Sequence, residues 1–61
     1  MNTSANVDVR AKAMSYGLRM WEVAEELGIL DSALSRKLRR ELPVEEKQKI
    51  YAAIDRIVAR R

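Results

Sequence analysis

Neither cysteine nor histidine occurs among the 61 residues of the sequence. These two side chains are among the commonest catalytic bases and nucleophiles, and they are also the usual ligands of zinc. Their absence excludes disulfide bonds and thiolate metal sites, and we expect no catalytic site, bound metal or cofactor. The nine acidic residues stand among basic residues at helical spacing, which is typical of a solvated helix surface. The lack of cysteine also agrees with a reducing compartment.

Long apolar runs are missing as well, since no stretch approaches the ~20 apolar residues that a membrane-spanning helix needs. The polar residues 1–6 lack the basic and then apolar pattern of a secretion signal. These features predict a cytoplasmic protein with no membrane partner. The missing catalytic groups leave no small-molecule substrate either. A chain of this length forms one domain at most, and its core is small.

Glycine and proline are scarce, with two glycines and one proline, and helix-forming residues dominate the rest. No segment of strand length alternates apolar and polar residues. We therefore predict an all-α fold, a compact four-helix domain in which residues 1–5 are disordered. Gly17, Gly28 and Pro43 divide the chain, and the predicted helices span about 7–16, 20–27, 31–40 and 43–60.

Apolar residues at helical spacing predict which face of each helix is buried. Asn6 is the predicted N-cap of the first helix. The buried face of that helix is predicted to contain Val7, Arg10, Ala11, Met14 and either Gly17 or Leu18. We expect residues 29–30 to form a buried turn. We also expect Trp21 to pack between the first two helices rather than line DNA, and the methionines to fill the core.

The last helix carries a broad apolar arc that includes the stem of Lys47. Its apolar members are Val44, Ile50, Tyr51, Ile54, Ile57 and Val58. One buried stripe needs an arc of roughly 100°, so this arc is wider than a single small core requires. We therefore expect a homodimer contact on this helix through Tyr51, Ile54 and Val58. The alternative is a monomer in which the first helix covers the whole arc.

Positive charge is concentrated in one short window of the chain. The net charge is +3, and residues 31–40 combine four basic residues with one acidic residue. A clustered basic segment is the usual footprint of contact with a polyanion such as DNA. If Leu34 and Leu38 face the core, a helical wheel places a polar and basic set opposite them. This set contains Ser32, Arg36, Arg39 and Arg40, with Ser35 at its margin.

Residues 20–39 combine the features of two short helices that cross closely. Ala24 is small enough for the crossing, and Gly28 allows the positive φ of a tight turn. Apolar residues on both sides of the turn attach the two helices to a core. The segment resembles the helix-turn-helix of Cro-type phage and bacterial repressors. The shared residues are Val23, Ala24, Leu27, Gly28, Ile29 and Leu34, followed by Ser35 and Arg36.

A looser resemblance covers nearly the whole chain. Residues 34–39, followed by a Glu-rich helix after Pro43, resemble short four-helix regulators of prophages and mobile elements. Two residues depart from the Cro-type pattern. Lys37 replaces an apolar residue, and Leu30 replaces a common capping Ser or Thr, which moves the expected cap to Asp31.

The resemblance implies a lambda-repressor-like fold in which the helix of residues 31–40 enters the major groove of double-stranded DNA. The family's contact positions fall on Asp31, Ser32, Ser35, Arg36 and Arg39. Base readout is predicted for Ser32, Ser35, Arg36 and Arg39, since an arginine can donate two parallel hydrogen bonds to guanine. Phosphate contacts are predicted for Arg19, Lys37 and Arg40.

The predicted function is therefore a sequence-specific transcriptional regulator, such as a repressor, and not an enzyme. A related possibility is a recombination-directionality or excision factor that binds DNA and shapes an integrase complex. A third possibility belongs to another class, a helical protein-binding module that uses an apolar groove and does not bind DNA. The clustered charge of residues 31–40 favours the two DNA-binding functions.

Overall fold

The structure is a computed structural model that describes residues 5–61. It contains the helices α1 (Val7–Ser15), α2 (Met20–Leu27), α3 (Asp31–Lys37) and α4 (Val44–Arg60), and this part of the chain has no strand. The predicted all-α fold is confirmed. The predicted disorder of residues 1–5 falls mainly on residues 1–4, which lie outside the described residues. None of the helices in residues 5–61 has the length and apolar character needed to cross a membrane.

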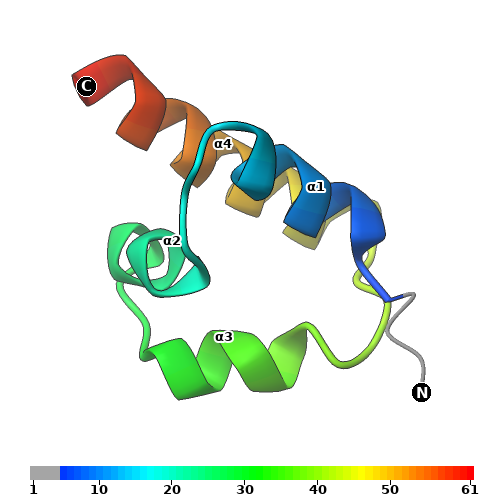
Figure 1. The fold of residues 1–61 in the computed structure, drawn as a ribbon. Coiled ribbons are helices and arrows are strands. Elements are labelled where there is room, and N and C mark those ends of the chain that lie inside the picture. The colour runs from blue at the N-terminus through cyan, green and yellow to red at the C-terminus, as the bar shows by residue number, and fades with distance from the viewer. Residues whose placement is uncertain (1–4) are drawn as a thin grey trace.

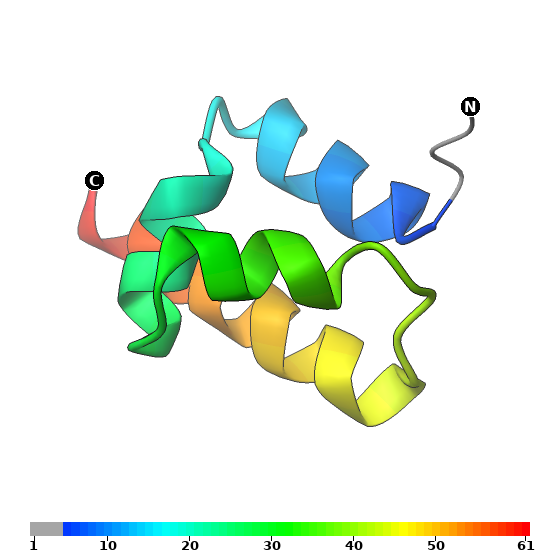
Figure 2. The same cartoon turned by 90° about the horizontal axis from the view of Figure 1, so that it is seen from below.

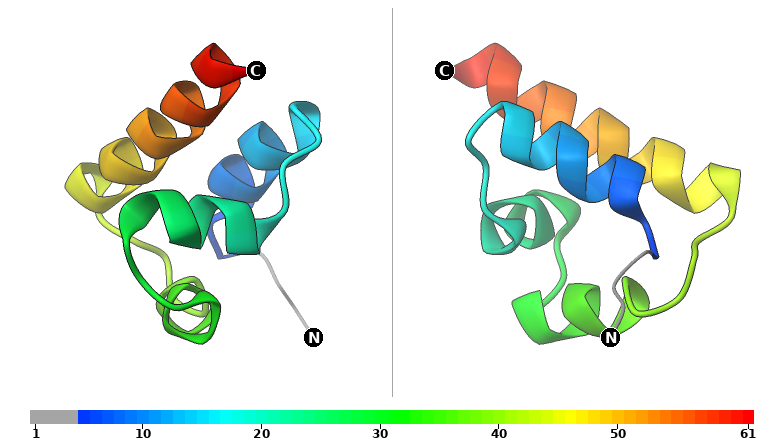
Figure 3. Two further views of the ribbon diagram at one scale, coloured as in Figure 1. Left: turned by 90° about the vertical axis from the view of Figure 1, so that its left-hand side faces the viewer. Right: turned by 45° about the vertical axis from the view of Figure 1, so that its right-hand side comes forward.

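Helices α1 and α4 run side by side in the same direction (Figure 1). The ion pairs between them show this parallel arrangement, because a later residue of α1 pairs with a later residue of α4. The Lys47 ammonium lies 2.9 Å from the Asp8 carboxylate, and the Lys12 ammonium lies 3.3 Å from the Asp55 carboxylate. Figure 3 shows α3 at the edge of the molecule opposite α1, with α2 between α3 and the C-terminal part of α4. Since α2 contacts both α3 and α4, it connects the two sides of the domain.

The core draws apolar residues from all four helices. Leu34 and Leu38, the pair predicted to attach the basic segment to the core, are each 1% exposed. Ala24, the predicted close-approach residue, is also buried. The buried set consists of Val9, Ala13, Leu18, Val23, Ala24, Leu34, Leu38, Ile50, Ala53, Ile54 and Ile57.

Helix α1 buries a different face from the predicted one. Val9 and Ala13 are fully buried, whereas Val7 is 55% exposed and Met14 is 75% exposed. The predicted face also contained Arg10, and burying a charge without a partner is costly. The observed face avoids this cost, because Arg10 stays at the surface.

Several apolar side chains lie at the surface near α2, contrary to prediction. Trp21 is 51% exposed, and Ile29 and Leu30 are also exposed. Trp21 therefore does not pack between α1 and α2, and residues 29–30 do not form a buried turn. Trp21 lies roughly 110° around α2 from the centre of its buried face, at ~100° per residue. Of the methionines predicted to fill the core, Met20 packs against it, and Met1 lies outside the described residues.

The two glycines that were predicted to divide the chain end α1 and α2 in the left-handed conformation. Gly17 has a φ of 71° and Gly28 has a φ of 77°. The next N–H in each case bonds to the carbonyl five residues earlier, from Leu18 to Ala13 at 2.9 Å and from Ile29 to Ala24 at 3.0 Å. This is the pattern of a glycine-terminated helix, and it turns the chain sharply into the following segment.

Helix α3 ends at Lys37, earlier than the predicted end at residue 40. The N–H groups of Arg39 and Arg40 bond to carbonyls three residues earlier, at 3.3 and 3.5 Å, so the chain leaves the α-helix through a tighter turn. The expected cap at Asp31 is also wrong. Leu30 holds the N-cap position and makes no side-chain cap bond.

Candidate nucleic-acid interface

Helices α2 and α3 are joined by the short turn of residues 28–30 and contact each other. Leu34 is buried on the inner side of α3, so this helix is attached to the domain by one face. Figure 3 shows that α3 lies at the edge of the molecule. The outer face of α3 is therefore open to a partner as large as a DNA duplex.

The structure puts three of the four predicted base-reading residues on this outer face. Ser32, Ser35 and Arg36 are exposed. At ~100° per residue they lie within an arc of roughly 100°, on the side of α3 away from Leu34. Arg39 is exposed as well, but it lies in the turn after α3, so its predicted position on the helical face is wrong.

We define the basic segment as Arg36, Lys37, Arg39 and Arg40. Among residues 5–61, Lys37 is the only one of these four cations that forms an ion pair, with the Glu46 carboxylate at 3.1 Å. Most other cations in residues 5–61 do form ion pairs, namely Lys12, Lys47, Arg56, Arg60 and Arg61. Cations without an ion pair in residues 5–61 therefore cluster at the C-terminal end of α3.

Lys49 is a further cation next to α3 that sequence reasoning missed. It forms no ion pair within residues 5–61, and with Lys37 and Ile29 it lines a shallow depression between α3 and α4. Lys49 belongs to the last helix, and only the packing of α4 brings it close to α3. The surrounding residues contain no pattern that predicts this proximity.

Arg19, a predicted phosphate contact, precedes α2 and is exposed. Its backbone N–H donates to the Glu22 Oε1 atom at 2.8 Å. The Glu22 carboxylate therefore caps this N–H at the start of α2, and it also accepts from Arg61 at 2.9 Å. The Arg19 side chain remains at the surface.

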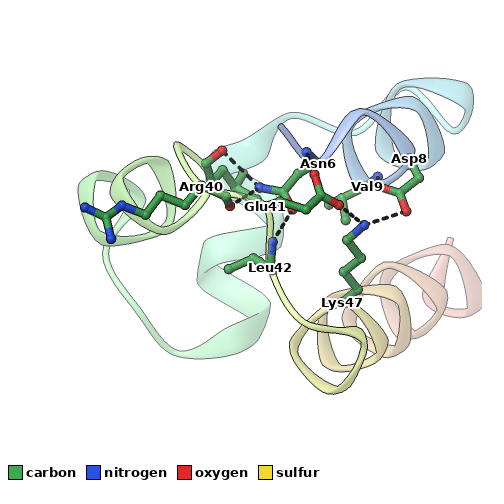
Figure 4. Close-up of polar contacts among 8 residues, drawn as sticks. Asn6, Asp8, Val9, Arg40, Glu41, Leu42 and Lys47 are labelled. Atoms are coloured by element: carbon green, nitrogen blue, oxygen red, sulfur yellow. Dashed lines mark hydrogen bonds and ion pairs between the residues drawn. The ribbon is translucent and has the colours of Figure 1, made fainter. Parts of the chain in front are cut away.

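Asn6 connects α1 to the loop of residues 38–43, which follows α3. Asn6 stands at the N-cap position of α1 with a φ of 58°, but its side chain makes no cap bond, so the capping prediction is wrong. The side-chain amide donates instead to the carbonyls of Leu38 at 3.0 Å and Arg40 at 2.7 Å. Figure 4 shows these bonds, and Figure 2 shows the loop beside the start of α1. The sequence carried no signal for this connection.

Charged side chains reinforce the same junction. The Lys47 ammonium pairs with the carboxylates of Glu41 and Asp8 (Figure 4). The Asn6 backbone N–H and the Lys47 ammonium together hold the pKa of Glu41 below its usual value. The hydrogen bond from Lys47 likewise lowers the pKa of Asp8. Both carboxylates therefore stay ionised down to acidic pH and bind Lys47.

A second ionic cluster joins α2 to α4. The Glu26 carboxylate accepts from Arg56 at 2.8 Å and from Arg60 at 2.7 Å. These two hydrogen bonds, with Arg60 contributing most, lower the pKa of Glu26 to about 2. The exposed Trp21 lies beside this cluster, in a depression that it shares with Glu25 and Ile57. Arg56 and Arg60 are therefore paired within the domain and do not add to its unpaired positive charge.

The residues predicted to form a dimer contact on α4 differ in exposure. Ile54 is 0% exposed within one chain, so it belongs to the core and cannot meet a partner. Tyr51 and Val58 are partly buried against that core. The Lys12 ammonium lies 5.4 Å from the centre of the Tyr51 ring, so α1 covers part of the arc, in line with the monomer alternative. Tyr51 and Val58 keep a partly open edge.

Residues 5–61 contain no group of three or more acidic side chains that could hold a metal ion. Comparison of the sequence with protein-family models and with curated proteins, and of the structure with solved structures, finds no match.

Proposed function

We propose that this protein is a sequence-specific regulator that binds double-stranded DNA by inserting α3 into the major groove. One observation carries the proposal. The short pair α2 and α3 presents an exposed polar face that ends in Arg36, Arg39 and Arg40, all without an ion pair in residues 5–61. Unpaired arginines on a solvent-facing helix and turn provide both charge and the donor geometry that recognises DNA.

Each residue of the interface has a proposed role. Arg36 lies on the outer face of α3, where it donates two hydrogen bonds to the O6 and N7 atoms of a guanine. Ser32 and Ser35 bond to base edges or to phosphate oxygens. Lys37, Arg39 and Arg40, with Lys49 beside them, contact phosphates along the groove. Arg39 moves from base readout to this group because it lies beyond the helix.

Binding of this kind regulates by occupying a DNA site or by recruiting other proteins to it. The protein then acts in the cytoplasm without a catalytic step, as repressors of prophages and mobile elements do. An excision factor that shapes an integrase complex would use the same interface. The discriminating observation is whether the bound site lies at a promoter or at a recombination site.

A homodimer is part of the proposal, because one helix reads too few base pairs for strong discrimination. Two half-sites about 34 Å apart on one face of DNA are the usual solution. The partly open edge of Tyr51 and Val58 is the proposed contact. Ile54 is left out of this contact, because its side chain is fully buried within one chain.

The competing function is a protein-binding module, and the exposed Trp21 and Leu30 favour it. Aromatic and aliphatic side chains that remain open to solvent are typical of protein-protein contacts. This function predicts that substitutions in the basic segment leave partner binding unchanged.

Binding of the protein to random duplex pools at several salt concentrations tests the proposal. If each protomer contacts about three phosphates, log K against log salt has a slope of roughly −3, at ~0.9 per contact. The variant Arg39→Ala should make this slope less negative by roughly 0.9. Arg10→Ala is the matched control, because Arg10 is also exposed and has no ion pair within residues 5–61, but it lies on α1. Affinity that does not change with salt would contradict the proposal.

A further inference from the structure

Asn6 is the one polar residue of residues 5–61 that is buried, with an exposed fraction of 0%. Its φ of 58° is left-handed, a region that asparagine tolerates better than most residues. Two unusual features thus coincide at a residue that lies outside the helix-turn-helix. Packing alone does not explain such a residue, because burial of an amide costs free energy unless its polar atoms are hydrogen-bonded.

The side-chain amide of Asn6 matches three backbone groups of the loop of residues 38–43. Its nitrogen donates to the carbonyls of Leu38 and Arg40, and its oxygen accepts the N–H of Leu42 at 3.0 Å. The last carbonyls of a helix have no partner within the helix. Asn6 therefore supplies, from α1, a hydrogen bond at the end of α3. Its two donors and one acceptor are a combination that serine and aspartate lack.

The bonded backbone groups surround the two arginines of the loop. Arg39 lies between the bonded carbonyls of Leu38 and Arg40, and the bonded N–H of Leu42 follows shortly after. The direction in which both arginine side chains leave the domain depends on this stretch of backbone. A loop that is already ordered before binding pays less conformational entropy when its arginines meet phosphates.

We infer that Asn6 is a positioning residue of the DNA interface, which holds Arg39 and Arg40 where they can contact phosphates beside α3. The inference rests on the DNA-binding function proposed above. Asn6 does not touch DNA itself. It fixes the backbone on which the two arginines stand, through its three hydrogen bonds to the loop (Figure 4).

The test uses Asn6→Gly, because glycine accepts the left-handed φ and the change leaves the net charge unaltered. Ile57→Ala is the matched control, since it removes buried volume from α4 and leaves the loop bonds in place. Both variants are studied at a temperature at which circular dichroism shows them folded. If Asn6→Gly does not fold, Asn6→Ser replaces it, because a single hydroxyl donor cannot serve both carbonyls.

The first measurement needs no DNA. Backbone ¹⁵N relaxation of the free protein should show fast motion at residues 39–42 in Asn6→Gly, with α3 as rigid as in the parent protein. In Ile57→Ala the loop should stay rigid. A loop that is equally rigid in Asn6→Gly and in the parent protein overturns the inference.

The second measurement is the salt dependence of DNA binding. Loss of both arginine contacts in Asn6→Gly should reduce the slope of log K against log salt by up to roughly 1.8, at ~0.9 per contact. Ile57→Ala should keep the parent slope, since lost stability alone does not change the number of phosphates contacted. An unchanged slope in Asn6→Gly overturns the inference. If the parent protein does not bind DNA, the proposed function fails, and the relaxation measurement alone decides whether Asn6 orders the loop.

Discussion

Replacement of Ala24 by leucine should destabilise the domain strongly without changing any residue of the proposed DNA-binding face. Ala24 is 1% exposed on α2, the helix that contacts both α3 and α4. Its carbonyl also accepts the Ile29 N–H at 3.0 Å, which closes the turn toward α3. A larger side chain at this position has no open space to enter, so α2 must move away from its neighbours and strain the turn.

The size of the effect follows from the size of the domain. Overpacking a close-packed core costs about 1–3 kcal/mol. A core of this size supplies about 3–5 kcal/mol in total. A loss of about 2 kcal/mol from about 4 kcal/mol lowers the ratio of folded to unfolded protein from roughly 1,000 to roughly 30. With an unfolding entropy of about 2.1 cal/mol/K per residue, the melting temperature of a chain this short falls by about 15 °C.

Thermal unfolding followed by circular dichroism measures this change. Ala52→Leu is the matched control, because it makes the same substitution at an exposed position of α4. We expect its melting temperature to stay within a few degrees of the parent value. If Ala24→Leu melts at the same temperature as Ala52→Leu, then Ala24 is not the residue at which the helices approach closely.

Three further predictions concern DNA readout, pH and assembly. Arg36→Ala should cost about 1–3 kcal/mol and relax the preference at one base pair, whereas Arg40→Ala should weaken all sequences about equally. An unchanged specificity profile in Arg36→Ala would contradict base readout. Because Arg60 and Arg56 lower the pKa of Glu26 from 4.5 to about 2, this carboxylate contributes stability above its ordinary pKa, and that contribution is lost as the pH falls from 4.5 toward 2. Glu26→Gln should flatten the dependence of melting temperature on pH over this range, and a curve of the parent shape would refute the assignment. Sedimentation of the complex should find two protomers per DNA site, and Tyr51→Glu and Val58→Glu should reduce pairing. One protomer per saturated site refutes the dimer, and a dimer that survives both substitutions refutes only the α4 contact.

The helical wheel predicted correctly which side chains of α3 face outward, and it failed just beyond the end of this helix. Leu34 and Leu38 lie four residues apart, and their burial oriented Ser32, Ser35 and Arg36 outward as the helical wheel required. The wheel assumed that the helix continued to residue 40. The chain leaves the helix after Lys37, so a rule based on helical period no longer describes Arg39.

Local interactions explain what the sequence by itself determined. The start and end of α2, the left-handed turns at Gly17 and Gly28, and the all-α class depend on residues within about one or two turns of each other. A residue's neighbours in the chain are therefore enough to predict them. The concentration of charge in residues 31–40 is likewise a property of the sequence.

Only the tertiary structure decided which face of α1 is buried, where α3 ends and which cations remain unpaired. Helix α1 is apolar on two sides, and contact with α4 selects Val9 and Ala13 over Val7 and Met14. The bonds from Asn6 to the end of α3 join residues 32 and 34 positions apart. Each ion pair that neutralises a cation elsewhere in the domain also depends on how the helices pack. No local pattern encodes these choices, because their energies arise between segments that meet only after the chain has folded.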